Sequence, residues 1–170
     1  MIFPNYSVYS VPLCFKGFVE AICQLLFANC FFDNLLRGPM PTDRKEHLLQ
    51  LARAAQKNAH APYSNFHVGA AVLLENGEIF TGCNVENASY GLTNCAERSA
   101  IFAAVSKLGG ANVKIAAVAV TNDHNAPCSP CGACRQVIAE FGRKAVIWYQ
   151  GRDGIKESTL EALLPDSFSL

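Results

Sequence analysis

The spacing of apolar and polar residues predicts that helices and strands alternate along most of the chain. Helical spacing predicts three long helices and a short terminal turn, over residues 42–58, 95–108, 131–141 and 160–163. Apolar runs predict five strands, over residues 67–74, 78–84, 113–120, 145–149 and 155–158. The first two flank Asn76-Gly77, a dipeptide typical of tight hairpins. The alternation favours an α/β fold in which helices cover both faces of one sheet.

Residues 1–40 have a different pattern, and we predict a boundary after them. Between Phe18 and Phe32 the sequence is almost continuously apolar. The run is shorter than the roughly 20 residues of a spanning helix, and no basic region precedes it. We therefore expect no stable membrane insertion. A cleaved targeting peptide, an amphipathic docking helix and a translated leader, with Met40 as the functional start, all remain open. The expected organisation is an N-terminal extension of unknown role at 1–40 and a single domain at 41–170.

Composition narrows the class of partner and the compartment. The 170 residues carry 14 basic and 14 acidic side chains, so the formal net charge is zero. A nucleic-acid binder usually shows a clustered basic excess, so a small neutral ligand fits better. The chain has eight cysteines, but with 51% apolar residues it can build a core without disulfides. Thiolate metal ligands must stay reduced, which favours the cytoplasm.

Three cysteines and a glutamate carry the clearest chemical signal. Cys131 and Cys134 are separated by two residues, which lets both thiolates bind one tetrahedral zinc ion. Cys95 supplies a third ligand, and the fourth position stays open for water. Glu97, two residues after Cys95, then serves as the proton-transfer group. A ligand-x-Glu motif followed by Pro-Cys-x-x-Cys is the known signature of zinc deaminases.

Charge around such a site must be balanced. Zinc with three thiolates carries a net charge of −1. Helix N-termini at both ligand segments, together with Arg98 and Arg135, are the available compensation. We assign this role to Arg98, which directly follows Glu97, and leave Arg135 open between a metal-site and a surface role.

Residues 42–170 resemble the small homotetrameric cytidine deaminases from end to end. The resemblance rests on five segments, which span residues 61–70, 82–90, 94–98, 129–136 and 163–168. It implies a three-layer α/β/α sandwich around a mixed five-stranded sheet, one Zn²⁺ per subunit, and hydrolytic deamination of cytidine and deoxycytidine in pyrimidine salvage. Residues 1–40 have no counterpart in this pattern.

The resemblance also implies roles for individual residues. Asn84 and Glu86 would hold the sugar hydroxyls of the nucleoside, and Tyr90 closes the same segment. Phe66 would stack on the pyrimidine, the Ala96 amide would bind the base carbonyl oxygen, and the Ser129 carbonyl would bind the amino group. Phe168 would enter the site of a neighbouring subunit. For Phe66, simple core packing is the alternative.

Three rival functions remain at this point. A deaminase acting on a base within RNA or DNA would need a phosphate-binding surface, and a deaminase of a cytosine nucleoside antibiotic would share the zinc motif. Asn84 and Glu86, together with the zero net charge, argue against the first rival. The same two residues, together with Phe66, argue against the second. The third rival is a structural four-cysteine zinc module, with Cys83 or Cys128 as fourth ligand, which would leave Glu97 without a role.

Overall fold

Five strands form one mixed sheet in the computed structural model, which describes residues 42–168. Their order across the sheet is β2-β1-β3-β4-β5. The strands are β1 (Val68–Leu74), β2 (Ile79–Cys83), β3 (Ile115–Asn122), β4 (Val146–Gly151) and β5 (Gly154–Thr159). Only β3 and β4 pair in parallel, and the three other neighbouring pairs are antiparallel. The mixed five-stranded sheet predicted above is confirmed.

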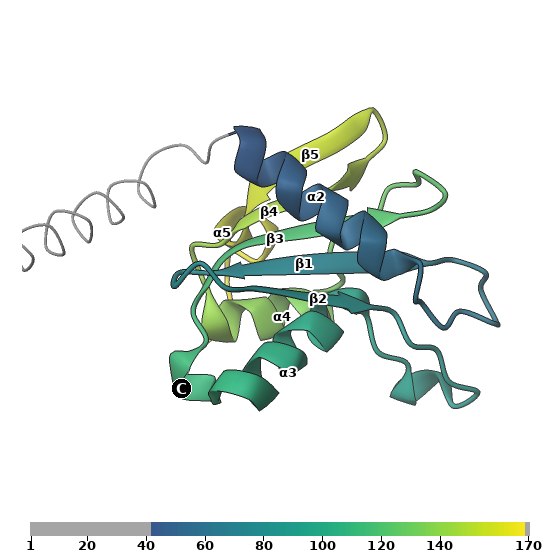
Figure 1. Cartoon of the computed structure of the whole chain (residues 1–170), viewed down its shortest axis with the longest axis horizontal. Helices are drawn as coiled ribbons and strands as arrows, with labels where there is room; N and C mark the ends of the chain where they lie inside the picture. Colours follow the sequence, from purple (N-terminus) through teal and green to yellow (C-terminus); the bar gives the residue numbers. More distant parts are fainter. Residues whose placement is uncertain (1–41, 169–170) are drawn as a thin grey trace, which may run out of the picture. The chain divides into compact units, whose positions relative to one another are not determined.

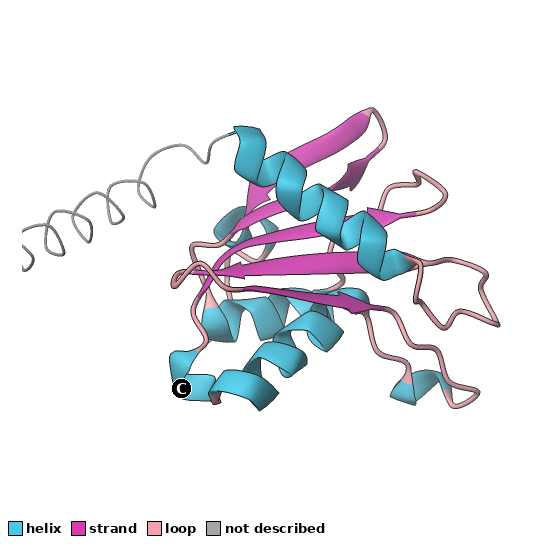
Figure 2. Ribbon diagram, viewed as in Figure 1, coloured by secondary structure: helices cyan, strands magenta, loops and turns pink. Residues whose placement is uncertain are grey.

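Helices lie on both faces of this sheet (Figures 1 and 2). They are α2 (Thr42–Gln56), α3 (Ala96–Leu108), α4 (Gly132–Phe141) and the short α5 (Leu160–Leu163). Helix α2 crosses one face, and α3 and α4 run along the opposite face. The three-layer α/β/α arrangement is therefore confirmed. Two single 3-10 turns, at Tyr90–Leu92 and Gly110–Asn112, were not predicted.

The β1–β2 hairpin turns where Asn76-Gly77 predicts it. The Gly77 amide donates to the Leu74 carbonyl at 3.0 Å, and the Leu74 amide donates to the Glu78 carbonyl at 2.9 Å. Gly77 has a φ of +89°, which glycine adopts without steric cost. The hairpin places β1 in the interior of the sheet, where all seven of its residues are buried.

The direction of the strands decides where α3 and α4 begin. Strands β2 and β3 are both antiparallel to β1, so they run in the same direction and end at the same edge of the sheet. Helix α3 follows β2 and α4 follows β3, each after a loop. Both helix N-termini therefore lie at the carboxyl ends of these strands, the edge at which α/β sheets bind ligands.

Strand β3 ends two residues later than predicted. The apolar run stops at Val120, but the strand continues through Thr121 and Asn122. Both polar side chains are buried, and each has a partner. Thr121 Oγ1 donates to Gln56 Oε1 at 3.0 Å, and Asn122 Nδ2 donates to the Ala126 carbonyl at 2.7 Å. Pairing with β1, opposite Val68 and Gly69, thus extends the strand past the point where the hydrophobic pattern ends, and these hydrogen bonds satisfy the buried polar groups.

The described residues 42–168 lie within the predicted domain at 41–170. Residues Pro41–Leu170 form one compact unit, and the boundary after residue 40 stays a prediction. The expectations for residues 1–40, including the leader and docking-helix readings, fall outside the described residues. Within 42–168, each helix is too short or too polar to cross a bilayer.

Candidate metal centre

Cys95 and Cys131 occupy equivalent places at the starts of two helices. Cys95 is the N-cap residue of α3 and Cys131 that of α4, and both have extended backbone angles. Neither sulfur caps its own helix, so both are free to point away from the helix axis. Cys134 lies in the first turn of α4 and is fully buried. A helix start therefore supplies every sulfur of the group.

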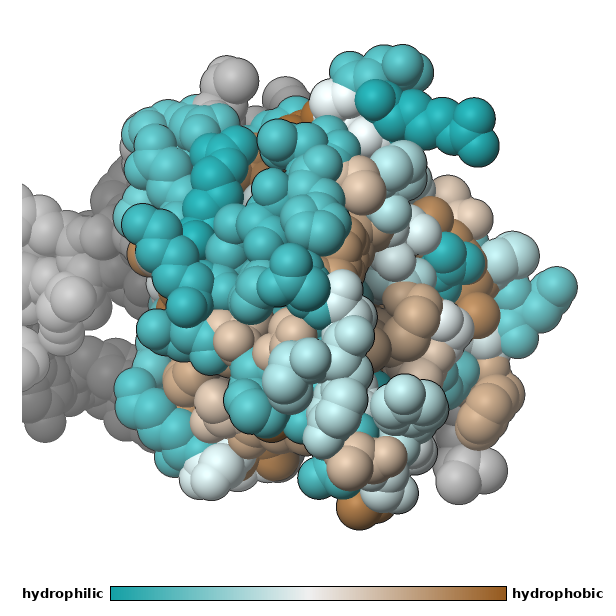
Figure 3. Space-filling model, turned by 90° about the vertical axis from the view of Figure 1, so that its right-hand side faces the viewer, coloured by the Kyte–Doolittle hydropathy of each residue, from teal (hydrophilic) through white to brown (hydrophobic). Residues whose placement is uncertain are grey.

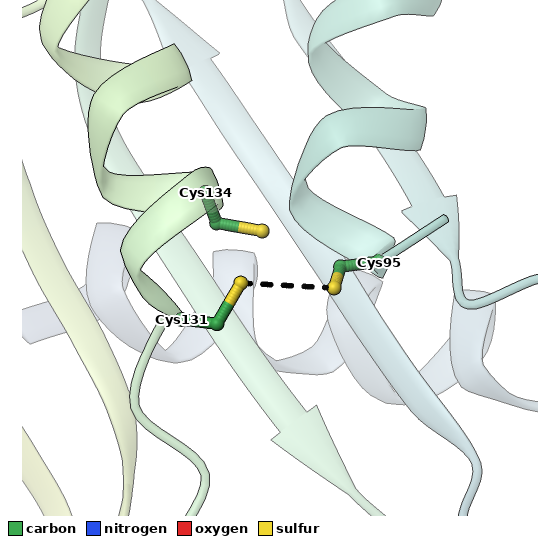
Figure 4. Close-up of side chains that lie close together, drawn as sticks. All are labelled: Cys95, Cys131 and Cys134. Atoms are coloured by element: carbon green, nitrogen blue, oxygen red, sulfur yellow. Dashed lines mark hydrogen bonds between the residues drawn. The ribbon is translucent and has the colours of Figure 1, made fainter. Parts of the chain in front are cut away.

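The three sulfur atoms converge, as Figure 4 shows. All lie within 4.8 Å of one another, and the Cys95 and Cys131 Sγ atoms are 3.9 Å apart. A zinc–sulfur bond of about 2.3 Å in tetrahedral geometry places two sulfurs about 3.8 Å apart. The cluster is therefore able to hold a metal ion, and its thiol donors suit zinc.

Electrostatics already favour a thiolate in this cluster. The hydrogen bond from the Cys134 thiol lowers the pKa of Cys95 to about 5, against the opposing effect of burial and with help from Arg98. The same hydrogen bond raises the pKa of Cys134, which is the proton donor of the pair. The N-terminal ends of α3 and α4 add partial positive charge near the sulfurs. Cys95 therefore ionises before Cys134.

Glu97 lies in the first turn of α3, almost completely buried, with 4% of its surface exposed. Burial raises the pKa of its carboxyl to about 7, and the nearby Cys95 thiolate adds to the shift. A carboxyl with this pKa exchanges protons readily near neutral pH. It does not belong to the ligand cluster, which within the described chain consists of the three cysteines.

Arg98, to which the sequence analysis assigned charge compensation, lies against a sulfur of the cluster. Arg98 Nη2 lies 3.5 Å from Cys95 Sγ and 3.4 Å from the Thr93 carbonyl oxygen. Its Nε is buried without a hydrogen-bond partner among the described residues. Arg98 therefore brings its positive charge directly to a sulfur of the cluster.

Arg135 is directed elsewhere. Its guanidinium donates to the Pro130 carbonyl at 2.7 Å, the Leu163 carbonyl at 2.9 Å and Ser129 Oγ at 3.3 Å. These bonds tie the segment before Cys131 to the end of α5. Among the described contacts Arg135 supports the loop and does not touch a thiol.

Cys83 and Cys128 were the candidates for a fourth zinc ligand, and neither lies close enough to the other sulfurs. Neither sulfur belongs to the group of three within the part of the chain described. Burial raises the pKa of Cys128 to about 11, which keeps this thiol protonated. Glu97, by contrast, is buried beside the cluster. A four-cysteine structural site is not what these residues form.

Asn84 follows β2 and is 9% exposed. Its Oδ1 accepts from the Val68 amide at 2.8 Å, and its Nδ2 donates to the Phe66 carbonyl at 2.8 Å. The side chain thus holds the end of β2 against the start of β1 by hydrogen bonds. One acceptor lone pair and one amide proton remain for a ligand.

Glu86 lies two residues further along and accepts hydrogen bonds from the loop between α2 and β1. The Ser64 hydroxyl donates to Oε1, and the Tyr63 and Ser64 amides donate to Oε2 at 2.9 and 3.2 Å. These bonds, the Ser64 hydroxyl first, lower the pKa of Glu86, so the carboxylate is ionised at neutral pH. The sequence analysis assigned no role to Ser64. The only local signal was a hydroxyl beside a Pro-containing turn.

A hollow of about 300 Å³ opens beside Glu86 and is lined by Tyr63, Ser64, Tyr90 and Thr93. Tyr90 is 78% exposed and meets the Tyr63 ring edge to face at 6.2 Å. Figure 3 faces this end of the molecule, where apolar residues are interspersed among hydrophilic ones.

The remaining predicted contacts lie in different surroundings. Phe66 is partly buried, packs against the core and meets His124 edge to face at 5.3 Å. Ala96 is buried at the start of α3, next to Cys95. Ser129 is exposed two residues before Cys131.

Phe168 is 69% exposed and lines a second hollow with Gly110 and Phe141, at the far ends of α3 and α4. Helix α3 has 13 residues and is therefore about 20 Å long. Phe168 consequently lies away from its own chain's cysteines, which are at the other ends of these helices.

A cysteine cluster at two helix starts, beside a buried carboxyl on an α/β/α fold, defines a thiolate metal centre with a proton-transfer group. Residues 42–150 match the family described as the cytidine and deoxycytidylate deaminase zinc-binding region. The chain belongs to this family, and its cofactor is zinc.

Individual relatives agree with this assignment. A cytidine deaminase of Sporosarcina psychrophila is 50% identical over 126 residues, which cover 73% of this chain and 90% of the relative. A cytidine deaminase of Halalkalibacterium halodurans is 45% identical over 127 residues, which cover 74% and 94%. The crystal structure of a Burkholderia pseudomallei cytidine deaminase superposes with a TM-score of 0.64 at 44% identity, and the match covers 72% of this chain and 98% of that one.

Proposed function

We propose that the protein catalyses the hydrolytic deamination of cytidine and deoxycytidine to uridine and deoxyuridine, with release of ammonia, as a step of pyrimidine salvage. The observation that carries the proposal is the buried Glu97 carboxyl beside the converging sulfurs of Cys95, Cys131 and Cys134. A purely structural zinc site has no use for such a carboxyl.

Glu97 performs the proton transfers in this mechanism. Zinc held by the three cysteines supplies a Lewis acid that makes water a nucleophile near neutral pH. Glu97 accepts one proton from the attacking water and passes it to the ring nitrogen. It then accepts the remaining proton of the added hydroxyl and passes it to the amino group, which leaves as ammonia while the carbonyl forms. A carboxyl with a pKa of about 7 serves both directions of transfer. Arg98, 3.5 Å from Cys95 Sγ, offsets the negative charge of the thiolates.

Binding of a free nucleoside is assigned to the segments around the hollow. Glu86 accepts a hydrogen bond from a sugar hydroxyl, Asn84 accepts from or donates to another, and Tyr90 lies beside them. Phe66 stacks on the pyrimidine, the Ala96 amide donates to the base carbonyl, and the Ser129 carbonyl accepts from the amino group.

The assembly and location form part of the same proposal. We place the enzyme in the cytoplasm as a homotetramer with one zinc ion per subunit, and the deaminase domain at residues 41–170. The exposed Phe168 ring, remote from its own cysteines, suits contact with a neighbouring subunit's site. Sedimentation of the purified chain tests the tetramer, and a mass of a single chain would contradict it.

One assay tests the activity. The purified protein is incubated with cytidine, and ammonia release and loss of the cytosine absorbance are followed. Deoxycytidine, a cytidine nucleotide and a short single-stranded oligonucleotide are run in parallel. Turnover of the two nucleosides alone supports the proposal, and turnover of the oligonucleotide alone contradicts it.

A further inference from the structure

The loop from Ala61 to Phe66 is built around the carboxylate of Glu86, a residue more than twenty positions away. Tyr63 and Ser64 present their two successive amides to Oε2, and the Ser64 hydroxyl reaches Oε1. The Asn65 amide donates back to the Ala61 carbonyl at 3.0 Å, and Asn65 adopts a φ of +53°. Asparagine tolerates this left-handed conformation better than most residues. The turn is therefore shaped to hold an anion, and Glu86 is the anion held.

Three of the acceptor positions of Glu86 are already occupied. An ionised carboxylate offers about four lone-pair sites. The Ser64 hydroxyl and the two amides use three of them. Glu86 itself lines the hollow, together with Tyr90 and Thr93. Glu86 can therefore accept one further hydroxyl, in a direction that its loop partners determine.

Ser64 connects this carboxylate to a second predicted substrate contact. Its hydroxyl has one proton, which it donates to Glu86, and its oxygen accepts from the Phe66 amide at 3.1 Å. The Phe66 carbonyl in turn accepts from Asn84 Nδ2 at 2.8 Å. A continuous set of hydrogen bonds thus runs from Glu86 through Ser64 and Phe66 to Asn84.

We propose that Ser64 is a positioning residue, which fixes the Glu86 carboxylate relative to Phe66 and leaves it one acceptor site for a single sugar hydroxyl. The proposal rests on the nucleoside deaminase function proposed above. Ser64 acts through Glu86 on binding and has no part in proton transfer. The hydroxyl that Glu86 accepts is then one that cytidine and deoxycytidine share. The lowered pKa of Glu86 agrees with a carboxylate kept ionised by these donors.

The test separates positioning from general stability. For Ser64→Ala we expect KM for both nucleosides to rise at least about tenfold, the scale of one hydrogen bond to a charged group, with kcat within about twofold. Ser64→Thr keeps the hydroxyl and should restore KM. Ser106→Ala, an exposed serine on α3, is the matched control and should leave KM unchanged. Thermal midpoint and zinc content are measured for every variant.

A double-mutant cycle with Glu86→Gln decides whether Ser64 acts through Glu86. We expect Ser64→Ala to change kcat/KM by less than about threefold in the Glu86→Gln background, because the partner is already altered. The proposal is overturned if the two effects multiply, if Ser64→Ala leaves KM unchanged, or if only the cytidine KM rises. Failure of the proposed function is a different result, since wild-type protein with full zinc would then deaminate neither nucleoside.

Discussion

Gly82 lies on β2 directly against the backbone of α3, and Gly82→Ala should displace Cys95 from the other two sulfurs. A Cβ atom at this position would lie 2.6 Å from the Ala96 carbonyl oxygen and 2.9 Å from the Ser99 carbonyl carbon. Non-bonded heavy atoms settle at about 3.5 Å or more, so the first turn of α3 must move by about 1 Å. That turn begins directly after Cys95 and contains Glu97.

A shift of this size exceeds what a zinc site absorbs, because zinc–ligand distances hold to within about 0.2 Å. We expect Gly82→Ala to lower the free energy of unfolding by about 1–3 kcal/mol, as overpacking does, and to weaken zinc affinity about 10- to 100-fold. Zinc affinity is measured by competition with a chelator, zinc content by mass spectrometry, and stability by urea unfolding.

Gly69→Ala is the matched control for this experiment. A Cβ there would lie 2.6 Å from the Gln56 amide nitrogen and would also collide with the Ala52 carbonyl, both on α2. Since α2 covers the opposite face of the sheet, this variant should lose stability while its folded fraction keeps wild-type zinc affinity. Wild-type zinc affinity in Gly82→Ala, or an equal loss in both variants, would refute the reasoning.

Further predictions concern the proton-transfer group, its neighbour and a hydrogen-bonded carboxylate outside the site. Glu97→Gln should keep zinc and bind cytidine but lower kcat about 10²- to 10⁴-fold; near wild-type turnover in a steady-state assay would contradict its role. Arg98→Gln should slow turnover about tenfold while zinc stays bound, and an undiminished rate at full zinc occupancy would remove Arg98 from the mechanism. Partial burial raises the pKa of Asp123, but hydrogen bonds from His67 outweigh it and hold the pKa below the usual value of 3.8. Ionised Asp123 therefore stabilises the fold above that pH, and the contribution is lost as pH falls through the lower folded pKa. Urea unfolding of Asp123→Asn should show a deficit against wild type at about pH 7 that shrinks as the pH is lowered below 3.8; a deficit independent of pH would exclude the ionised carboxylate as its cause.

Local features of the sequence were sufficient for much of this protein. The periods of apolar residues located every long helix and every strand, with errors of about two residues at the ends, because each element buries one face or both. The pair Cys131 and Cys134 was recognisable alone, since an N-cap residue and the third residue of the following helix lie close together in any helix start. Glu97 was recognisable from its spacing in the sequence, two residues after Cys95.

Only the tertiary structure decided how the distant parts meet. Cys95 reaches the other cysteines because β2 and β3 run in the same direction and end at one edge, which local sequence does not encode. Arg98 and Arg135 both follow a cysteine, yet helix packing brings the first to a sulfur and turns the second to the carbonyls of Pro130 and Leu163.

The contact between Ser64 and Glu86 joins segments 22 residues apart and leaves no trace in either segment's pattern. Side-chain chemistry and helix periodicity are local properties, and a sequence displays them directly. Hydrogen bonds and charge contacts between separate elements depend on the direction and packing of those elements, so they become visible only in the folded chain.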